Sequence, residues 1–300
     1  MTNEEFIKRC EEAKKALYHE KGIHYVCMSL LGSRYTGKLV EMYNSLDAKN
    51  ALDFAEKYFT YAEEHQNEEP IKRGLTKAEL RSHVDKYYKE GSKKASKEYD
   101  YYIYYYDMCC HLFVETANGC EREHELENML LQQDDVQSIS YPIGKYDNVY
   151  GIDRIITVGE NDKEYAVQIK PASFFMGAAG YYYKGGSRMD TYIDMACMLR
   201  KWYMTASEGI TTHYAIYNVE NNKNEWLLYY SDKDKKQKLL HPASSLFKEV
   251  NITDVQEFME LTNNVHANRK NDVENSEEMK KLKEMAVPQP QEYFKKLKRK

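Results

Sequence analysis

The chain lacks any long apolar run, and acidic side chains occur among its first twenty residues, where a secretory signal would be apolar. We therefore expect a cytoplasmic protein that has no membrane partner. Its six cysteines form no CxxC pair and no zinc-ligand spacing, so we expect neither disulfides nor zinc. Its nine histidines contain no HxH or HExxH cluster, and they read as structural residues rather than as metal ligands.

The chain also lacks a net positive charge. It has 43 basic and 48 acidic residues and a formal net charge of -5, whereas proteins that bind nucleic acids usually present a basic face. A nuclease, however, gathers carboxylates at its metal site, and local basic patches persist beneath an acidic total. The charge balance therefore argues only weakly against nucleic-acid binding.

One segment nearly matches a nucleotide-binding loop but lacks its decisive residue. Residues 32–39, GSRYTGKL, approach the phosphate-binding pattern GxxxxGK[ST], yet Leu39 stands where a hydroxyl would bind Mg²⁺. We therefore expect no nucleotide cofactor. Four basic residues, two in this segment and two in a Gly- and Tyr-rich segment further on, are candidates for contacts with DNA: Arg34, Lys38, Lys184 and Arg188.

Residues 1–98 have the apolar spacing of helices. Apolar side chains recur at steps of three and four over 3–20 and again over 46–65. A further helix is predicted after Thr76, because Thr76 is a typical N-cap with Glu79 three positions on, and Gly91 is its predicted end. We assign this helical region to recognition or dimerisation.

From residue 99 onward the pattern changes to mixed helix and strand. The segment 99–119 is apolar enough for a buried helix or a strand, and its period favours neither. A helix over 120–133 is followed by three strand-like segments that predict a meander, and then by a helix over 189–207.

One stripe of this second helix carries Ile193, Ala196, Cys197, Arg200 and Met204. Two further strands, over 212–219 and over 225–231 (EWLLYYS), come next. This order, α, β, β, β, α, β, β, predicts an α/β core over 99–250 with a mixed central sheet flanked by helices. Residues 251–300 read as a helical segment with a basic tail.

Polar residues stand at the ends of two neighbouring strands of this core. Asp153 lies at the start of one strand, and Gln168, Ile169 and Lys170 end the next, so a hairpin between the strands would bring them together. Phosphodiester hydrolysis requires a divalent cation held by oxygen ligands and a source of hydroxide. Asp153 is suited to bind the cation, and the Ile169 carbonyl to add a ligand. Gln168 and Lys170 share one face of the strand because side chains alternate.

This arrangement resembles the core of the PD-(D/E)XK nucleases over roughly residues 115 to 235. Asp153 followed after fifteen positions by Gln168-Ile169-Lys170 is similar to the motif of that superfamily, and the order of elements is similar to its fold. Most members have an acid where Gln168 stands, but the Mrr-like branch has Gln-x-Lys. Glu123, in phase with the apolar stripe of its helix, resembles the helix glutamate that joins the metal site in Mrr-like and Holliday-junction nucleases.

The resemblance implies a site in which Mg²⁺, replaceable by Mn²⁺, is held by Glu123, Asp153, Gln168 and the Ile169 carbonyl, while Lys170 orients the attacking water. A neutral amide is a weaker ligand than a carboxylate, which favours one tightly held metal over two. The product implied is a 5′-phosphate.

A chain of 300 residues with a helical extension and no helicase motor is most similar, within this superfamily, to a type II restriction endonuclease. Such an enzyme cuts double-stranded DNA at a specific sequence, and cutting a palindrome favours a homodimer. A methylation-dependent or junction-resolving Mrr-like nuclease is one alternative. A DNA-binding protein without catalysis, in which Asp153 and Lys170 only pair, is another.

Overall fold

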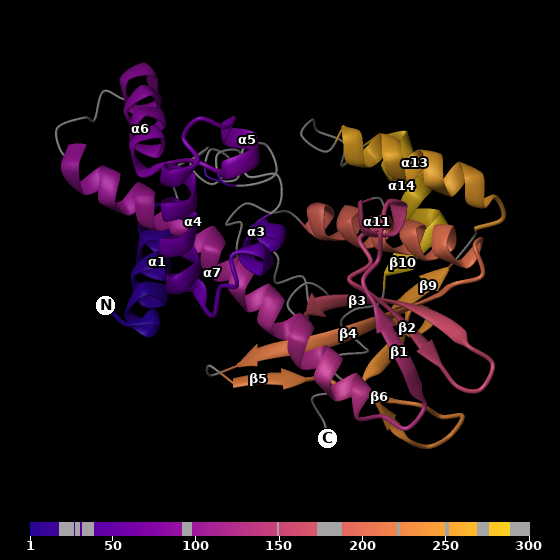
Figure 1. The fold of residues 1–300 in the computed structure, drawn as a ribbon. Coiled ribbons are helices and arrows are strands. Elements are labelled where there is room, and N and C mark those ends of the chain that lie inside the picture. Colours follow the sequence, from indigo (N-terminus) through magenta and orange to yellow (C-terminus); the bar gives the residue numbers. More distant parts are fainter. Residues whose placement is uncertain are drawn as a thin grey trace. The chain divides into compact units, whose positions relative to one another are not determined.

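The computed structural model divides the chain into two compact units, residues 1–124 and 125–300 (Figure 1). The structure describes residues 1–17, 27, 31, 39–91, 98–148, 150–172, 188–220, 223–249, 252–268 and 276–288. No helix in these ranges is long and apolar enough to cross a membrane.

The first unit is helical, as its apolar spacing predicted. Its described helices are α1 (Asn3–Leu17), α3 (Leu39–Ser45), α4 (Ala51–Glu64), α5 (Pro70–Arg73), α6 (Lys77–Gly91) and the first part of α7 (Glu98–Leu131). The segment 99–119, open between helix and strand in the sequence, belongs to α7. Residues 107–114 are all buried, and a helix that is buried all round shows no amphipathic period.

Aromatic rings form much of the core of this unit. The rings of Phe54 and Tyr58 on α4 lie 5.0 and 4.8 Å, between centroids, from the ring of Phe113 on α7. All three side chains are fully buried. The packing of α4 against α7 therefore rests on large rings, which explains part of the high aromatic content of the sequence.

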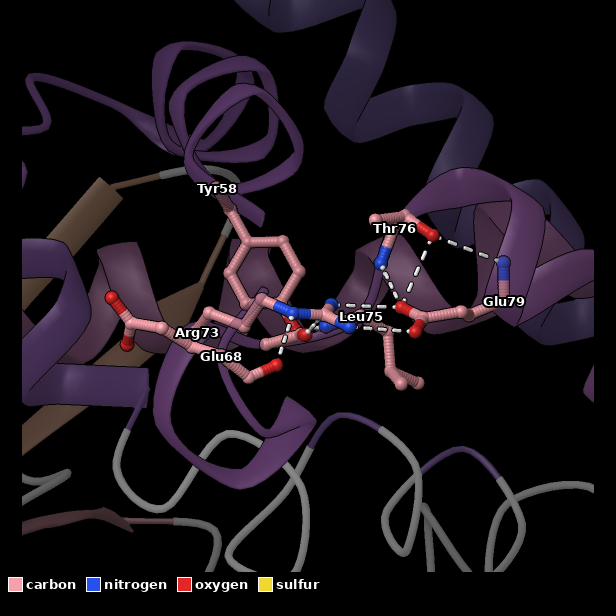
Figure 2. Close-up of polar contacts among 7 residues, drawn as sticks. Tyr58, Glu68, Arg73, Leu75, Thr76 and Glu79 are labelled. Atoms are coloured by element: carbon pink, nitrogen blue, oxygen red, sulfur yellow. Dashed lines mark hydrogen bonds and ion pairs between the residues drawn. The ribbon is translucent and has the colours of Figure 1, made fainter. Parts of the chain in front are cut away.

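Figure 2 shows a polar network at the start of α6. The predicted capping box is confirmed, because the Glu79 N–H donates to the Thr76 hydroxyl at 3.1 Å and the Thr76 N–H donates to the Glu79 carboxylate at 2.9 Å. The same carboxylate accepts from both terminal nitrogens of Arg73, at 2.8 and 2.7 Å. Arg73 is only 3% exposed. Its hydrogen bonds are the largest cause that lowers the pKa of Glu79 to about 2.

The second unit is a mixed α/β unit built on a curled sheet (Figure 1). The strand order is β1-β2-β3-β4-β5, and β8 also pairs with β4. These strands are β1 (Val136–Ser140), β2 (Arg154–Val158), β3 (Lys163–Pro171), β4 (Thr211–Glu220), β5 (Lys223–Trp226) and β8 (Leu240–Pro242). The first three form the predicted antiparallel meander. β4 then runs parallel to β3 after the helix α11 (Arg188–Ala206).

The two faces of the sheet carry different side chains because successive residues alternate. Val167 and Ile169 of β3 belong to an apolar cluster with Leu126 and Leu130 of α7. Ala166 belongs to a cluster on the opposite face that includes Met204 of α11. The even-numbered residues of β3 therefore point to the α11 side of the sheet.

A second helical layer covers α11 on its outer side. α13 (Val255–Ala267) and α14 (Glu277–Met285) pack with α11 in one apolar cluster, and Figure 1 shows α13 beside α11. The sequence predicted one apolar stripe on α11, but Met198 and Leu199, outside that stripe, are buried as well. The stripe was incomplete because α11 lies between the sheet and α13, so apolar side chains are required on two sides.

The remaining elements are short. They are α8 (Lys145–Asn148), β6 (Tyr229–Tyr230), β7 (Gln237–Lys238), α12 (Ala243–Leu246), β9 (Phe247–Glu249) and β10 (Ala286–Pro288). β10 pairs with β9, although the sequence predicted only helix and tail in this region. The strand over 225–231 predicted from EWLLYYS is divided between β5 and β6.

Candidate active site

The β2–β3 hairpin brings the polar residues of the sequence motif together. Its ladder begins with the pair Arg154 and Val167, and Asp153, one residue before β2, bonds to Val167 and Ile169 of β3. The Asp153 N–H, just before the first residue of β2, donates to the Val167 carbonyl at 2.9 Å, one residue out of step with the ladder.

Gln168 and Lys170 point to the α11 side because Ala166 does so and side chains alternate along β3. The Asp153 carboxylate lies near the same side, since its charge acts on Lys201 of α11.

The carboxylate of Asp153 is held by the backbone of β3. The Ile169 N–H donates to Asp153 Oδ2 at 2.6 Å. The other oxygen, Oδ1, accepts no hydrogen bond from the described part of the chain. Since the N–H and the C=O of a strand residue point to the same side, the Ile169 carbonyl also lies on the Asp153 side of β3.

Gln168 is a buried amide with a defined partner. It is 1% exposed, and its Nε2 donates to the carbonyl of Tyr150 at 3.1 Å. A buried amide requires such a partner because its desolvation is otherwise costly. This bond orients the side-chain oxygen of Gln168 and ties the segment before Asp153 to β3.

Tyr150 is itself fixed by a carboxylate that the sequence motif did not reveal. Glu208, just after α11, accepts from the hydroxyls of Tyr150 at 2.6 Å and Tyr146 at 2.7 Å and from Lys145 Nζ at 2.8 Å. The Lys145 bond, followed by those from the two tyrosines, lowers the pKa of Glu208 to about 2. Gln168 is thus connected through Tyr150 to the end of α11.

A second lysine, Lys201 on α11, lies beside the same segment. Its Nζ is 2.9 Å from the position that a Cβ on Gly151 would occupy. Burial and then the charge of Lys170 lower the pKa of Lys201, while the charge of Asp153 acts in the opposite direction. Sequence reasoning missed Lys201. The available signal was its position four residues after Cys197, at the edge of the apolar stripe of the helix that follows the motif.

Arg154, next to Asp153, points to the other side of the sheet. It is 3% exposed, forms a close ion pair with Glu127 of α7, and donates from Nη1 to the Asp153 carbonyl at 2.5 Å. Its guanidinium lies 4.1 Å from the ring centroid of Tyr141. Arg154 therefore attaches α7 to the strand end and fixes the main chain of Asp153.

The oxygen donors at this hairpin end suit Mg²⁺ better than a soft metal, because they are a carboxylate, an amide and a main-chain carbonyl. Among the described residues, no three His, Cys, Asp or Glu side chains form a group that could hold a metal ion. Asp153 is the carboxylate that the hairpin end would offer to a cation. Glu123, the other predicted ligand, is half-buried on α7 and belongs to the first unit, so its part in the site is a proposal.

The four predicted DNA contacts remain predictions. Arg34, Lys38 and Lys184 lie outside the described residues, and Arg188 is described only as the first residue of α11. Comparison with protein-family models, curated proteins and solved structures finds no match to the chain.

Proposed function

We propose that the second unit is a PD-(D/E)XK-type core and that the chain is a Mg²⁺-dependent endonuclease acting on double-stranded DNA. The observation that carries the proposal is the arrangement of Asp153, Gln168 and Lys170 at the open end of the β2–β3 hairpin. A strand order with an antiparallel meander followed by a parallel β4 supports it.

In this proposal a bound Mg²⁺ would supply positive charge that polarises the phosphoryl group and stabilises its developing charge. Asp153 would hold the cation through Oδ1, while the Ile169 N–H keeps the carboxylate in position through Oδ2. The Ile169 carbonyl and the Gln168 amide oxygen would be the further ligands, and the proposal includes Glu123 as the fourth. Lys170 would orient the attacking water and favour its ionised form. Mn²⁺ would substitute for Mg²⁺.

Within this class, the proposal is a type II restriction endonuclease that cuts a specific sequence as a homodimer and leaves 5′-phosphate ends. This finer assignment rests on the analogy of a stand-alone chain with a large helical extension. The alternative in which Asp153 and Lys170 merely pair receives no support from the geometry, because within the described residues the two side chains form no salt bridge.

The test is digestion of unmethylated phage DNA by the full chain in Mg²⁺, beside a Lys170→Ala variant. We expect discrete bands from the wild type and a rate lower by about 10²- to 10⁴-fold in the variant, the usual contribution of a positioned acid or base. Lys236→Ala is the matched control, because Lys236 is an exposed lysine in the same unit and should leave cleavage unchanged.

Substrate comparison separates the alternatives. If the chain cuts only methylated or four-way DNA, it is a Mrr-like nuclease and not a type II restriction endonuclease. Intact DNA of every kind in Mg²⁺ and Mn²⁺, with DNA affinity unaffected by either metal, would refute catalysis and leave a binding protein.

Gln168→Glu tests the amide directly. If its oxygen binds the cation, a carboxylate there should tighten Mg²⁺ binding. The same substitution removes the donor to the Tyr150 carbonyl, so without metal the variant should melt at a lower temperature than the wild type and recover more on adding Mg²⁺. Calorimetric Mg²⁺ binding no tighter than wild type would show that Gln168 acts only as a structural donor.

A further inference from the structure

Two lysines lie near one carboxylate on the α11 side of the sheet. Lys170 points to this face from β3 by strand alternation, and Lys201 reaches the segment before Asp153 from α11. Within the described residues, neither side-chain ammonium group forms a salt bridge or a hydrogen bond. With Asp153, the group has a formal charge of +1.

Such an arrangement is electrostatically unfavourable in the free protein. Lys201 is half-buried, and both burial and the like charge of Lys170 disfavour its charged form. The fold nevertheless leaves room for its ammonium. Gly151 has a φ of +60°, and a side chain there would come within 2.9 Å of Lys201 Nζ. Glycine at 151 thus allows the left-handed backbone conformation and also leaves space for the Lys201 ammonium.

An anion that contacts both ammonium groups would relieve this repulsion. Ammonium groups are donors only, and each binds a phosphate oxygen as a compact charge. A phosphate group offers several oxygens, so one group can contact both ammonium groups, and a divalent cation would add a partner for Asp153.

We infer that Lys170 and Lys201 form a binding site for a phosphate group beside Asp153. In this site Lys201 binds a phosphate oxygen from the α11 side, and Lys170 contacts the same group from the strand. The identification of the group as a DNA phosphodiester rests on the proposed function, but the anion site itself does not.

The first test uses no catalysis. The acylation rate of each lysine is measured by mass spectrometry at pH 8 and constant ionic strength, in chloride, in inorganic phosphate, and with a short DNA duplex in Ca²⁺. We expect phosphate or duplex to slow the labelling of Lys170 and Lys201 at least threefold while exposed Lys236 is unchanged. In Lys170→Gln, the protection of Lys201 should be lost.

The outcomes separate the two proposals. Protection by the duplex, with or without protection by inorganic phosphate, supports the site and its DNA ligand. Protection by inorganic phosphate alone supports the site but counts against DNA as the substrate. Unchanged labelling of Lys201 in both, or protection that persists fully in Lys170→Gln, overturns the inference even if the chain cuts DNA.

A pair of glycine variants gives a second test. Gly151→Ala should displace Lys201 and reduce the slope of log affinity for the duplex against log salt by about 0.9, the effect of one lost phosphate contact. Gly144→Ala is the matched control, because Gly144 has a φ of +62° but a Cβ there meets nothing within 4 Å. Equal slopes in the two variants would refute the role assigned to Lys201.

Discussion

Replacing Glu79 by Gln should make the chain less stable at neutral pH and should remove part of its acid sensitivity. Arg73 holds the pKa of Glu79 at about 2, below the usual 4.5. A difference of about 2.5 units corresponds to about 3.4 kcal/mol at 1.36 kcal/mol per unit. The Glu79 side chain is 35% exposed, so solvent screening reduces the contribution of the ion pair. We expect Glu79→Gln to lower the free energy of unfolding by about 1.5 kcal/mol. The side-chain oxygen of Gln can still accept the hydrogen bond from the Thr76 N–H, so the substitution tests the loss of the negative charge.

The sign of the pH effect follows from the lowered pKa. The stabilisation is complete above the unfolded pKa near 4.5 and is lost as the pH falls through about 2. At pH 3, therefore, the difference in the free energy of unfolding between wild type and Glu79→Gln should be less than half of its value at pH 7.

Urea unfolding of the full chain, followed by circular dichroism at pH 7 and pH 3, measures this difference. Glu68→Gln is the control, because Arg73 contacts only the main-chain carbonyl of Glu68, at 3.0 Å, as Figure 2 shows. The reasoning fails if Glu79→Gln matches the wild type at pH 7, or if its deficit is as large at pH 3 as at pH 7.

Two further predictions concern the site and its support. Tyr150→Phe removes one donor to Glu208 and loosens the segment whose carbonyl orients Gln168, so we expect slower cleavage with a smaller change in duplex affinity, measured as kcat against KM. Glu127→Ala leaves the buried guanidinium of Arg154 without its carboxylate and should cost about 3 kcal/mol in urea unfolding, whereas Glu127→Leu combined with Arg154→Met should recover most of that loss. If the double variant were as unstable as Glu127→Ala, the loss in Glu127→Ala would not come from a buried Arg154 charge without a partner.

The local pattern of the sequence was sufficient for the hairpin and the capped helix. Apolar residues on either side of a polar turn predicted β2 and β3, and the short connection between the two strands sets their register. Thr76 and Glu79 predicted the start of α6 because the capping bonds join residues three apart. These features depend on neighbours in the chain, so the sequence alone contains their cause.

The long helix α7 and the full buried surface of α11 were harder to predict from the sequence, and the physical reason is the same for both. An amphipathic period exists only where one side of a helix faces water. Residues 107–114 are buried all round, and α11 is covered by the sheet on one side and by α13 on the other. Burial on several sides is a property of the folded unit, and the sequence of a helix buried in this way shows no amphipathic period.

The sequence by itself determined that Asp153, Gln168 and Lys170 lie at one end of the two strands, because a tight hairpin brings the start of β2 beside the end of β3. Only the tertiary structure decided that Lys201 joins them and that Glu208 fixes Tyr150 beside Gln168. Both partners come from α11 and its end, more than thirty residues further along the chain. No local period relates residues that far apart, because their approach is set by how α11 packs on the sheet.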